Sequence, residues 1–198
     1  MYTKLPNLTI GFHGCNKEVY SRVIVNHEEL KESLNSYDWL GNGIYFWESN
    51  LTRAREWGER KYGKNSAVIG AVIDLGRCLN LTDSASERIL KNWYQALADK
   101  CKLAGIDIPK NRESNKSKDI LLRDLDCAVI QQVQELYRSD DESERAFDSI
   151  RGVFIEGDEP YPGSAFQSKT HIQICVCNPN CIKGYFAPRE LDNRFRNP

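Results

Sequence analysis

Short β-prone runs and helical spacing follow one another along the chain in a definite order. Runs of β-branched and aromatic residues predict strands at 9–12, 44–47, 67–75, 152–155, 172–176 and 182–186. Apolar residues at helical spacing predict helices at 18–25, 52–61, 83–104 and 120–136. The order of strands, then helices, then strands again predicts an α+β fold. Because the run 67–75 is nearly continuous, we expect it to lie in the core.

Turn residues predict where several of these elements begin and end. His13 and Gly14 follow the first strand and are expected to end it in a sharp turn, and the Gly-Asn-Gly segment 41–43 breaks the chain before the second strand. Asn50 is of a residue type that caps helices well, so it is expected to cap the second helix. The polar segment 105–118 is expected to be a loop between the two middle helices.

The length of the chain fits one domain. Its 198 residues are enough to bury a self-supporting core, so we expect a single domain over 1–198. In it, a helical insertion at about 83–149 would separate two β-rich parts. The sequence has no apolar run of membrane-spanning length, and 1–8 lacks the apolar stretch of a signal peptide. We therefore expect no membrane partner.

The charges almost cancel: 27 Lys and Arg stand against 28 Asp and Glu, for a formal net charge of -1. A protein that binds nucleic acid through its bulk charge carries a large positive excess, so any such contact must be local. Segment 100–123 has seven basic and three acidic residues, whereas 135–159 has nine acidic and three basic ones. Solvated surface is the simpler interpretation of both segments.

The cysteines bear on metal binding and on the cellular compartment. There are seven, without a C-x-x-C pair, which favours neither a disulfide framework nor a structural zinc site. Cys175 and Cys177 lie two apart on a predicted strand pattern, so they share one face and are interpreted as small buried residues. We expect a reducing, cytoplasmic location and no metal.

Three stretches place unusual polar residues at the ends or edges of predicted strands: 12–15 (Phe-His-Gly-Cys), 41–46 (Gly-Asn-Gly-Ile-Tyr-Phe) and 170–174 (Thr-His-Ile-Gln-Ile). Each is weak by itself, because a histidine after a strand is more often structural and an aromatic run more often core. Together they resemble the ADP-ribosyltransferase superfamily, in the branch related to diphtheria toxin and the poly(ADP-ribose) polymerases. The resemblance covers roughly 10–57 and 152–186, and not the helical middle.

The resemblance rests on the order of its motifs. In that branch a His-Gly pair on the first strand is followed by a Gly-x-Gly-Ile-Tyr-Phe segment and then by an Ala. Here these are His13 with Gly14, the segment 41–46, and Ala54. A third polar residue, usually Glu, then starts a late strand in the family, and Gln173 takes that place.

The family likeness implies two packed, mainly antiparallel sheets with an NAD cleft between them. In that cleft His13 would hydrogen-bond a ribose hydroxyl, the backbone of Gly14 would hold the carboxamide, and the Tyr45 ring would stack on the nicotinamide. Arg53 would reach the pyrophosphate, although a solvated helix face is the simpler interpretation of that residue. The implied NAD-binding residues are His13, Gly14, Cys15, Gly43, Tyr45 and Arg53.

The third motif position departs from the family pattern. The resemblance implies catalytic roles for His13, Tyr45 and Gln173, but an amide is neutral and takes no proton. Within the superfamily, loss of the Glu usually accompanies transfer of a single unit, so polymerisation is not expected. Either the acceptor reacts without a base, or His171 or Glu156 supplies one. A purely structural His171 is the alternative.

A Gly- and Pro-rich loop at 156–169 precedes the third motif. In the family this segment selects the acceptor. We therefore expect Tyr161 and Phe166 to stack on a base or pack on a protein target, and Gln167 and His171 to contact the acceptor. An ordinary surface loop stiffened by its prolines is the alternative.

The function that the resemblance implies is transfer of one ADP-ribose from NAD to RNA, single-stranded DNA or protein, with release of nicotinamide. A bacterial toxin or phage-defence effector with an antitoxin partner follows from family analogy alone. The basic segment 100–123 favours a nucleic acid. The alternatives are an NAD glycohydrolase, and a non-catalytic module that binds NAD or ADP-ribose, as Gln173 suggests. Trp39 and Trp57 are interpreted as core or cleft wall.

Overall fold

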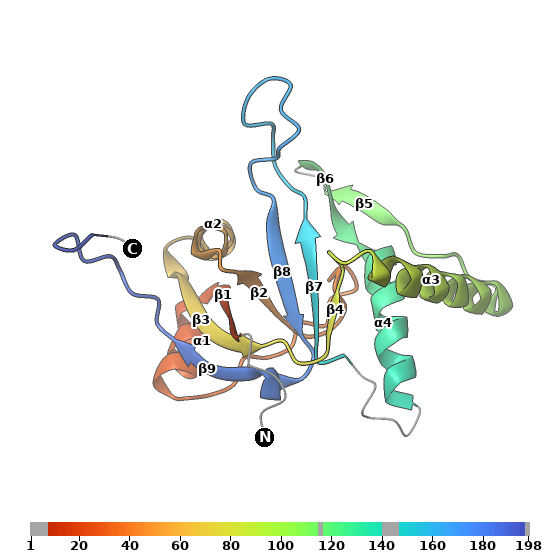
Figure 1. Ribbon diagram of the computed structural model, residues 1–198, viewed down its shortest axis with the longest axis horizontal. Helices are drawn as coiled ribbons and strands as arrows, with labels where there is room; N and C mark the ends of the chain where they lie inside the picture. The colour runs from red at the N-terminus through yellow and green to blue at the C-terminus, as the bar shows by residue number, and fades with distance from the viewer. Residues whose placement is uncertain (1–7, 115–116, 140–146, 197–198) are drawn as a thin grey trace.

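The computed structural model describes residues 8–114, 117–139 and 147–196, and a seven-stranded sheet lies at its centre (Figure 1). The strand order is β4-β7-β8-β2-β1-β3-β9, in which β4 and β7 are parallel and all other neighbours antiparallel. The strands are β1 (Leu8–Asn16), β2 (Ile44–Glu48), β3 (Ser66–Asp74), β4 (Cys78–Asn80), β7 (Ser149–Phe154), β8 (His171–Val176) and β9 (Ile182–Phe186). All six predicted strands are confirmed, and the fold class is α+β.

The sheet divides where β1 meets β2. These strands pair only at Gly11 with Glu48 and at Phe12 with Trp47, whereas β1 pairs with β3 along its whole length. In Figure 1, β3 and β9 run in a different direction from β7 and β8. One continuous, twisted sheet therefore replaces the expected pair of packed sheets, because the two parts stay joined through a short ladder.

The first strand is longer than the sequence predicted. It runs through His13 and Gly14 to Asn16, because β3 pairs with it as far as Ser66. The expected sharp turn at His13 is therefore wrong. Helix α1 (Lys17–Tyr20) and a π-helical turn (Ser21–Val25) follow directly.

Helix α2 (Leu51–Tyr62) covers β1 and β3 and ends in a short 3-10 turn (Gly63–Asn65). Its predicted cap is confirmed, since the side-chain oxygen of Asn50 accepts a hydrogen bond of 3.0 Å from the backbone N–H of Arg53. Three of its basic residues, Arg53, Arg60 and Lys61, line one cavity together with His13 of β1 and Tyr45 of β2.

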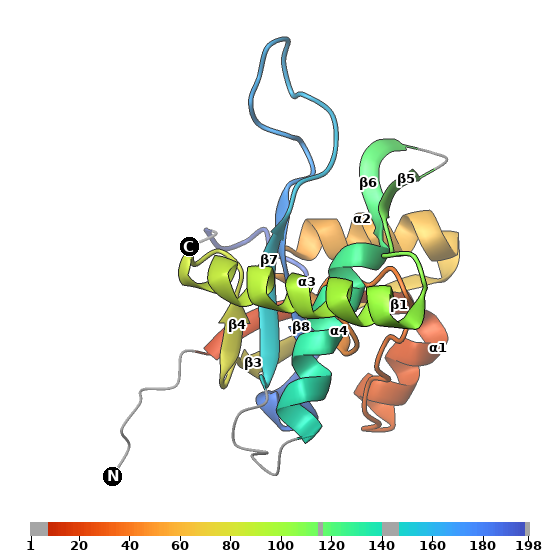
Figure 2. The same ribbon diagram turned by 90° about the vertical axis from the view of Figure 1, so that its right-hand side faces the viewer.

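The segment between β4 and β7 contains two helices and a hairpin. It consists of α3 (Ala85–Ala104), β5 (Asn111–Ser114), β6 (Ser117–Arg123) and α4 (Asp124–Ser139), and α3 lies across α4 in Figure 2. The predicted loop is confirmed only over 105–110, since β5 begins at Asn111, and the predicted helical start at 120 is wrong because that residue lies on β6. Asn111 explains the new boundary, because its side-chain oxygen accepts the first free N–H groups of α4, those of Leu125 and Asp126. The acidic part 140–146 lies outside the described residues.

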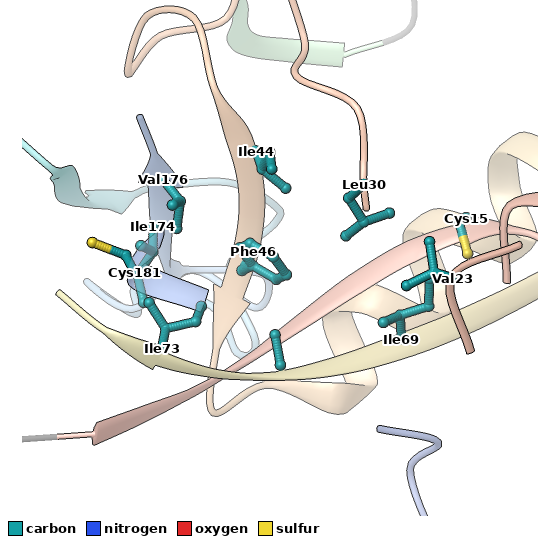
Figure 3. Close-up of a cluster of buried hydrophobic side chains, with 11 residues drawn as sticks. Cys15, Val23, Leu30, Ile44, Phe46, Ile69, Ile73, Ile174, Val176 and Cys181 are labelled. Carbon is teal, nitrogen blue, oxygen red and sulfur yellow. The ribbon is translucent and has the colours of Figure 1, made fainter. Parts of the chain in front are cut away.

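The main hydrophobic core lies between the two parts of the sheet. Figure 3 shows Phe46 of β2, Ile174 of β8 and Ile69 of β3 in one cluster. Ile69 and Ile73 are fully buried, which confirms that the apolar run 67–75 belongs to the core. A 3-10 turn (Pro179–Cys181) closes the cluster through Cys181.

In the described part, no helix combines the length and apolar character needed to cross a membrane. The seven cysteines are free thiols, with Cys175 fully buried and Cys177 partly so.

Candidate active site

A cavity of about 380 Å³ opens where β1 and β2 diverge, and we call it the cleft. Its volume lies in the range of small-molecule sites. Residues from β1, β2, β7, β8, α2 and the segment 31–43 line it. The sequence-predicted residues among them are His13, Gly14, Gly43, Tyr45, Arg53, His171 and Gln173, together with Glu156, Trp39 and Trp57.

Strand register explains why the second and third motifs share a wall of the cleft. Strands β2 and β8 are antiparallel neighbours in which Trp47 pairs with Gln173. Since successive side chains point to opposite faces of a strand, Tyr45, Trp47 and Gln173 share one face. The residues between them, Phe46 and Ile174, point into the main core.

The side chain of His13 joins β1 to β2 just beyond the point where the backbone pairing of these strands stops. Its Nδ1 lies 2.8 Å from the backbone oxygen of Tyr45, and because a carbonyl oxygen only accepts, Nδ1 carries the proton. Burial lowers the pKa of His13, the bond to Tyr45 opposes this, and the charge of Lys61 lowers the pKa further. The ring is therefore neutral at pH 7, and its Nε2 is a hydrogen-bond acceptor.

Tyr45 is held rigidly in the wall of the cleft. Its hydroxyl donates to the backbone oxygen of Gly41 at 2.8 Å and accepts from the backbone N–H of Leu40 at 3.0 Å. Burial raises the pKa of Tyr45 far above its ordinary value, so the phenol stays protonated. The hydroxyl therefore anchors the segment before β2, and the ring is what Tyr45 presents to a ligand.

Gln173 stands at the centre of a chain of hydrogen bonds. Its Oε1 accepts from Nε1 of Trp39 at 2.7 Å, and its Nε2 lies 3.0 Å from Nε2 of His171. Nδ1 of His171 lies 2.6 Å from the backbone oxygen of Lys169. Burial lowers the pKa of His171, the bond to Lys169 opposes this, the charge of Arg53 lowers it, and that of Glu156 raises it. Both ring nitrogens thus have partners in a neutral histidine.

Arg53 and Glu156 form a buried ion pair at the edge of the cleft. They are 7% and 6% exposed, and a 2.8 Å contact joins Nη2 of Arg53 to Oε2 of Glu156. Glu56 binds the other end of the same guanidinium, and Arg60 lies 3.8 Å from Glu156. Arg53 is therefore engaged by carboxylates, and Glu156 is paired with arginines instead of being a free base.

Two motif glycines allow close packing around the cleft. A Cβ on Gly14 would lie 2.4 Å from the backbone oxygen of Ala54 in α2, so this glycine lets the helix approach β1. Ala54, the alanine of the family motif, is thus the residue against which Gly14 packs. A Cβ on Gly43 would lie 2.6 Å from Sγ of Cys175 and from the backbone oxygen of Val176. Packing within the protein already requires both glycines.

Four predicted residues do not line the cleft. Cys15 is buried in the main core, where burial raises the pKa of its thiol to about 11. Tyr161, Phe166 and Gln167 are exposed on the loop between β7 and β8, which projects from the body of the protein in Figures 1 and 2. The loop begins and ends beside the cleft, since Phe154 and His171 both line it.

Sequence reasoning placed His171 and Trp57 at the cleft but missed Trp47 and Phe154, which complete a row of rings along it. His171 stacks on Phe154 at 5.4 Å between ring centroids, and Trp47 lies 6.1 Å from His171 and 5.6 Å from Trp57. Trp47 had a usable signal, because it stands two residues after Tyr45 on the same strand. Phe154 had none, since its place beside His171 depends on the pairing of β7 with β8.

Two buried N–H groups on cleft residues lack a hydrogen-bond partner among the described residues: Nε1 of Trp47 and Nε of Arg53. Such groups are rare in native proteins unless water or a ligand satisfies them. Nowhere in 8–114, 117–139 and 147–196 do three or more His, Cys, Asp or Glu side chains gather as a metal site would require.

A second cavity, of about 600 Å³, lies between α3 and α4, and we call it the groove. Leu90, Tyr94, Val129 and Ile130 are among the residues that line it. Trp39 lines both the groove and the cleft. The two cavities are therefore neighbours across one indole ring.

Comparison of the chain with protein-family models, with curated proteins and with solved structures returned no match. The cleft is therefore interpreted from its own geometry and from the motif resemblance.

Proposed function

We propose that the chain is an NAD-dependent mono-ADP-ribosyltransferase, which moves one ADP-ribose from NAD to a macromolecule and releases nicotinamide. One observation carries the proposal. His13, Tyr45 and Gln173 come from three separate strands, β1, β2 and β8, and all line the cleft. These are the three positions that the motif resemblance implies for catalysis.

The nicotinamide riboside half of NAD has two partners in this proposal. The ring of Tyr45 provides the stacking face, a contact worth about 0.5–1.5 kcal/mol beyond area burial. Because two hydrogen bonds already hold Tyr45, little side-chain entropy is lost when the ligand binds. Nε2 of His13 accepts a hydrogen bond from a ribose hydroxyl, because the Nδ1 proton is already donated to the backbone oxygen of Tyr45.

Gln173 would bind the ribose as a neutral group. Trp39 and His171 use one lone pair of Oε1 and one hydrogen of Nε2, so the amide keeps a further lone pair and a further hydrogen for a ribose hydroxyl. Positive charge develops on the ribose as the bond to nicotinamide breaks, and fixed dipoles stabilise it without reorganisation. An amide takes no proton from an incoming acceptor, which supports single transfer over chain growth.

Arg60 and Lys61 are the better candidates for the pyrophosphate. Both line the cleft and both are exposed, and Lys61 lies over the Trp57 ring at 4.6 Å. Charge-assisted hydrogen bonds to phosphate are among the strongest polar contacts in proteins. Arg53, which the family likeness singled out, is instead held by Glu156, so we assign it to fastening α2 beside the cleft.

The loop 155–170 would present the acceptor. Tyr161 and Phe166 are exposed on it, and its ends lie beside the cleft, so a macromolecule that binds the loop is delivered to the reacting ribose. The same family analogy extends to a cytoplasmic bacterial toxin or defence effector restrained by an antitoxin.

Incubation with NAD labelled in its adenylate phosphate, together with a cell extract, tests the proposal. We expect nicotinamide release and a labelled macromolecule, and separate nuclease and protease digestion shows its class. The variant His13→Asn should lose both signals, whereas His27→Asn, at an exposed position, should keep them. Nicotinamide release without label would make the protein an NAD glycohydrolase, and an absence of NAD consumption would overturn the proposal.

A further inference from the structure

Trp39 occupies the wall between the cleft and the groove. It lies in the segment that leads to β2, is 8% exposed, and lines both cavities. Its indole nitrogen donates to Oε1 of Gln173 at 2.7 Å. Because an indole N–H can only donate, this contact fixes which end of the Gln173 amide is the oxygen.

The other end of the amide is fixed independently. Nδ1 of His171 donates to the backbone oxygen of Lys169, so Nε2 of the neutral ring accepts and must receive a hydrogen from Nε2 of Gln173. Two neighbours of opposite hydrogen-bonding character therefore hold Gln173 in one orientation. Turning the amide over would set N–H against the indole N–H and oxygen against the ring nitrogen.

The indole ring of Trp39 packs against strand β7 of the sheet. Gly152 of β7 pairs with Gln173 of β8, and a Cβ on Gly152 would lie 2.7 Å from Cη2 of Trp39. Phe154 meets the indole edge to face at 5.3 Å, and the guanidinium of Arg123 lies 5.1 Å from the centre of the indole ring. The ring is thus enclosed by β7 and by the residue that joins β6 to α4.

We propose that Trp39 is a positioning residue that sets the orientation of the Gln173 amide, so that its remaining N–H is directed to a ribose hydroxyl. The inference deepens the proposed NAD chemistry and rests on it. It also accounts for the departure from the family pattern. A carboxylate at 173 accepts from Trp39 but has no hydrogen for Nε2 of His171, so it can pair with that ring only when His171 is protonated, and burial lowers the pKa of His171. The indole and a neutral His171 together favour an amide.

Nuclear magnetic resonance of the ligand-free protein tests the geometry apart from any activity. In the wild type we expect the Gln173 side-chain amide to give two well-separated proton signals and His171 to be the neutral tautomer protonated at Nδ1. Trp39→Phe keeps an aromatic ring but removes the N–H, so the Gln173 signals should move toward those of a free amide. Trp93→Phe in α3, which packs in a separate cluster, is the control. Unchanged Gln173 signals in folded Trp39→Phe would overturn the proposal.

Turnover of NAD tests the consequence. We expect Trp39→Phe to lower kcat for nicotinamide release about tenfold, the equivalent of one hydrogen bond, with little change in KM. In a Gln173→Ala background the same substitution should have no further effect, because the group that it positions is gone. Equal losses in both backgrounds would show that Trp39 acts only on the general structure and would overturn the proposal.

A glycine pair provides a second route to the same test. Gly152→Ala places a methyl group against the indole ring and should shift the Gln173 amide signals as Trp39→Phe does. Gly184→Ala in β9 meets nothing within 4 Å and should leave them unchanged. If Gly152→Ala displaces the indole signals without affecting those of Gln173, the positioning role is refuted. A protein that releases no nicotinamide while showing the expected resonances would refute the proposed function and leave the Trp39 geometry standing.

Discussion

The cleft and the groove differ in size and in the side chains that line them, and the smaller cavity holds the candidate catalytic residues. The groove is the larger cavity, yet it lies between α3 and α4 and is lined mainly by apolar side chains such as Leu90 and Val129. The cleft is smaller, but His13, Tyr45 and Gln173 converge on it from three strands. Helix packing leaves apolar space as a by-product, whereas polar groups from distant strands meet only where the fold holds them together. The candidate site is therefore identified by the polar side chains that meet in it, and not by the volume of the cavity.

The two cavities also differ in how their charges are held. Arg53 and Glu156 beside the cleft are both more than nine-tenths buried, whereas Arg123 and Asp126 beside the groove form a longer contact of 3.7 Å with a partly exposed carboxylate. A buried charge depends on its partner, and an exposed one is solvated without it. Substitutions beside each cavity therefore test this contrast and the functional one.

The buried pair gives the largest expected effect. Glu156→Gln leaves the Arg53 guanidinium buried with Glu56 as its remaining close carboxylate partner, and we expect it to lower the free energy of unfolding by about 3–5 kcal/mol. Asp126→Asn beside the groove should cost less than about 1 kcal/mol. Urea denaturation of both variants measures the difference. Equal losses would remove the contrast between the two pairs.

A matched pair of tyrosines tests which cavity supports the reaction. Tyr45→Ala removes the ring on which nicotinamide is proposed to stack, and we expect nicotinamide release to fall at least about 100-fold, as misplaced substrates do. Tyr94→Ala on the groove wall should leave turnover unchanged. Both rates are measured at saturating NAD on protein shown to be folded by circular dichroism. Unchanged turnover in Tyr45→Ala would refute the assignment of the site.

Ile130 tests whether the groove wall is only structural. It is 2% exposed and lies against the Gly41 backbone, where a Cβ would come within 2.9 Å of its Cγ2. Ile130→Val should lower the free energy of unfolding by about 1 kcal/mol, the usual cost of one buried methylene group. We expect nicotinamide release per folded molecule to stay at the wild-type rate. A slower rate at unchanged stability would show that the groove acts on the cleft.

The histidines give the smallest effect, a dependence of stability on pH. Burial holds the pKa of His13 and of His171 below the ordinary value of 6.5, so both stay neutral in the folded protein while the unfolded chain takes up protons. The stability that depends on these neutral histidines is therefore fully present above pH 6.5, and the free energy of unfolding falls as the pH drops below that value. Denaturation at pH 7.5 and 5.5 measures the loss, which should shrink in His171→Asn and persist in the exposed-site control His27→Asn. An identical loss in both variants would contradict the assignment.

Local patterns in the sequence were sufficient for most of the sheet. The apolar runs predicted six of its seven strands, and Asn50 predicted the start of α2, because alternation and capping depend only on neighbouring residues. The same reasoning failed at 105–123. There the spacing of Ile120, Leu121 and Leu125 fits a helix, yet the first two residues lie on the hairpin strand β6. Pairing with β5 and the contact of Asn111 with α4 decided that boundary.

The sequence by itself determined the strands that hold a tyrosine and a late glutamine, and it placed a histidine and a glycine next to the first strand; pairing with β3 then extended that strand through them. Only the tertiary structure decided what those residues touch. The bond from Trp39 to Gln173 spans 134 positions and the ion pair of Arg53 with Glu156 spans 103. Strand pairing and helix packing set burial, protonation and orientation across such separations. For that physical reason the motifs were visible along the chain, whereas the contact of Trp39 with Gln173 and the pairing of Arg53 with Glu156 became visible only in the fold.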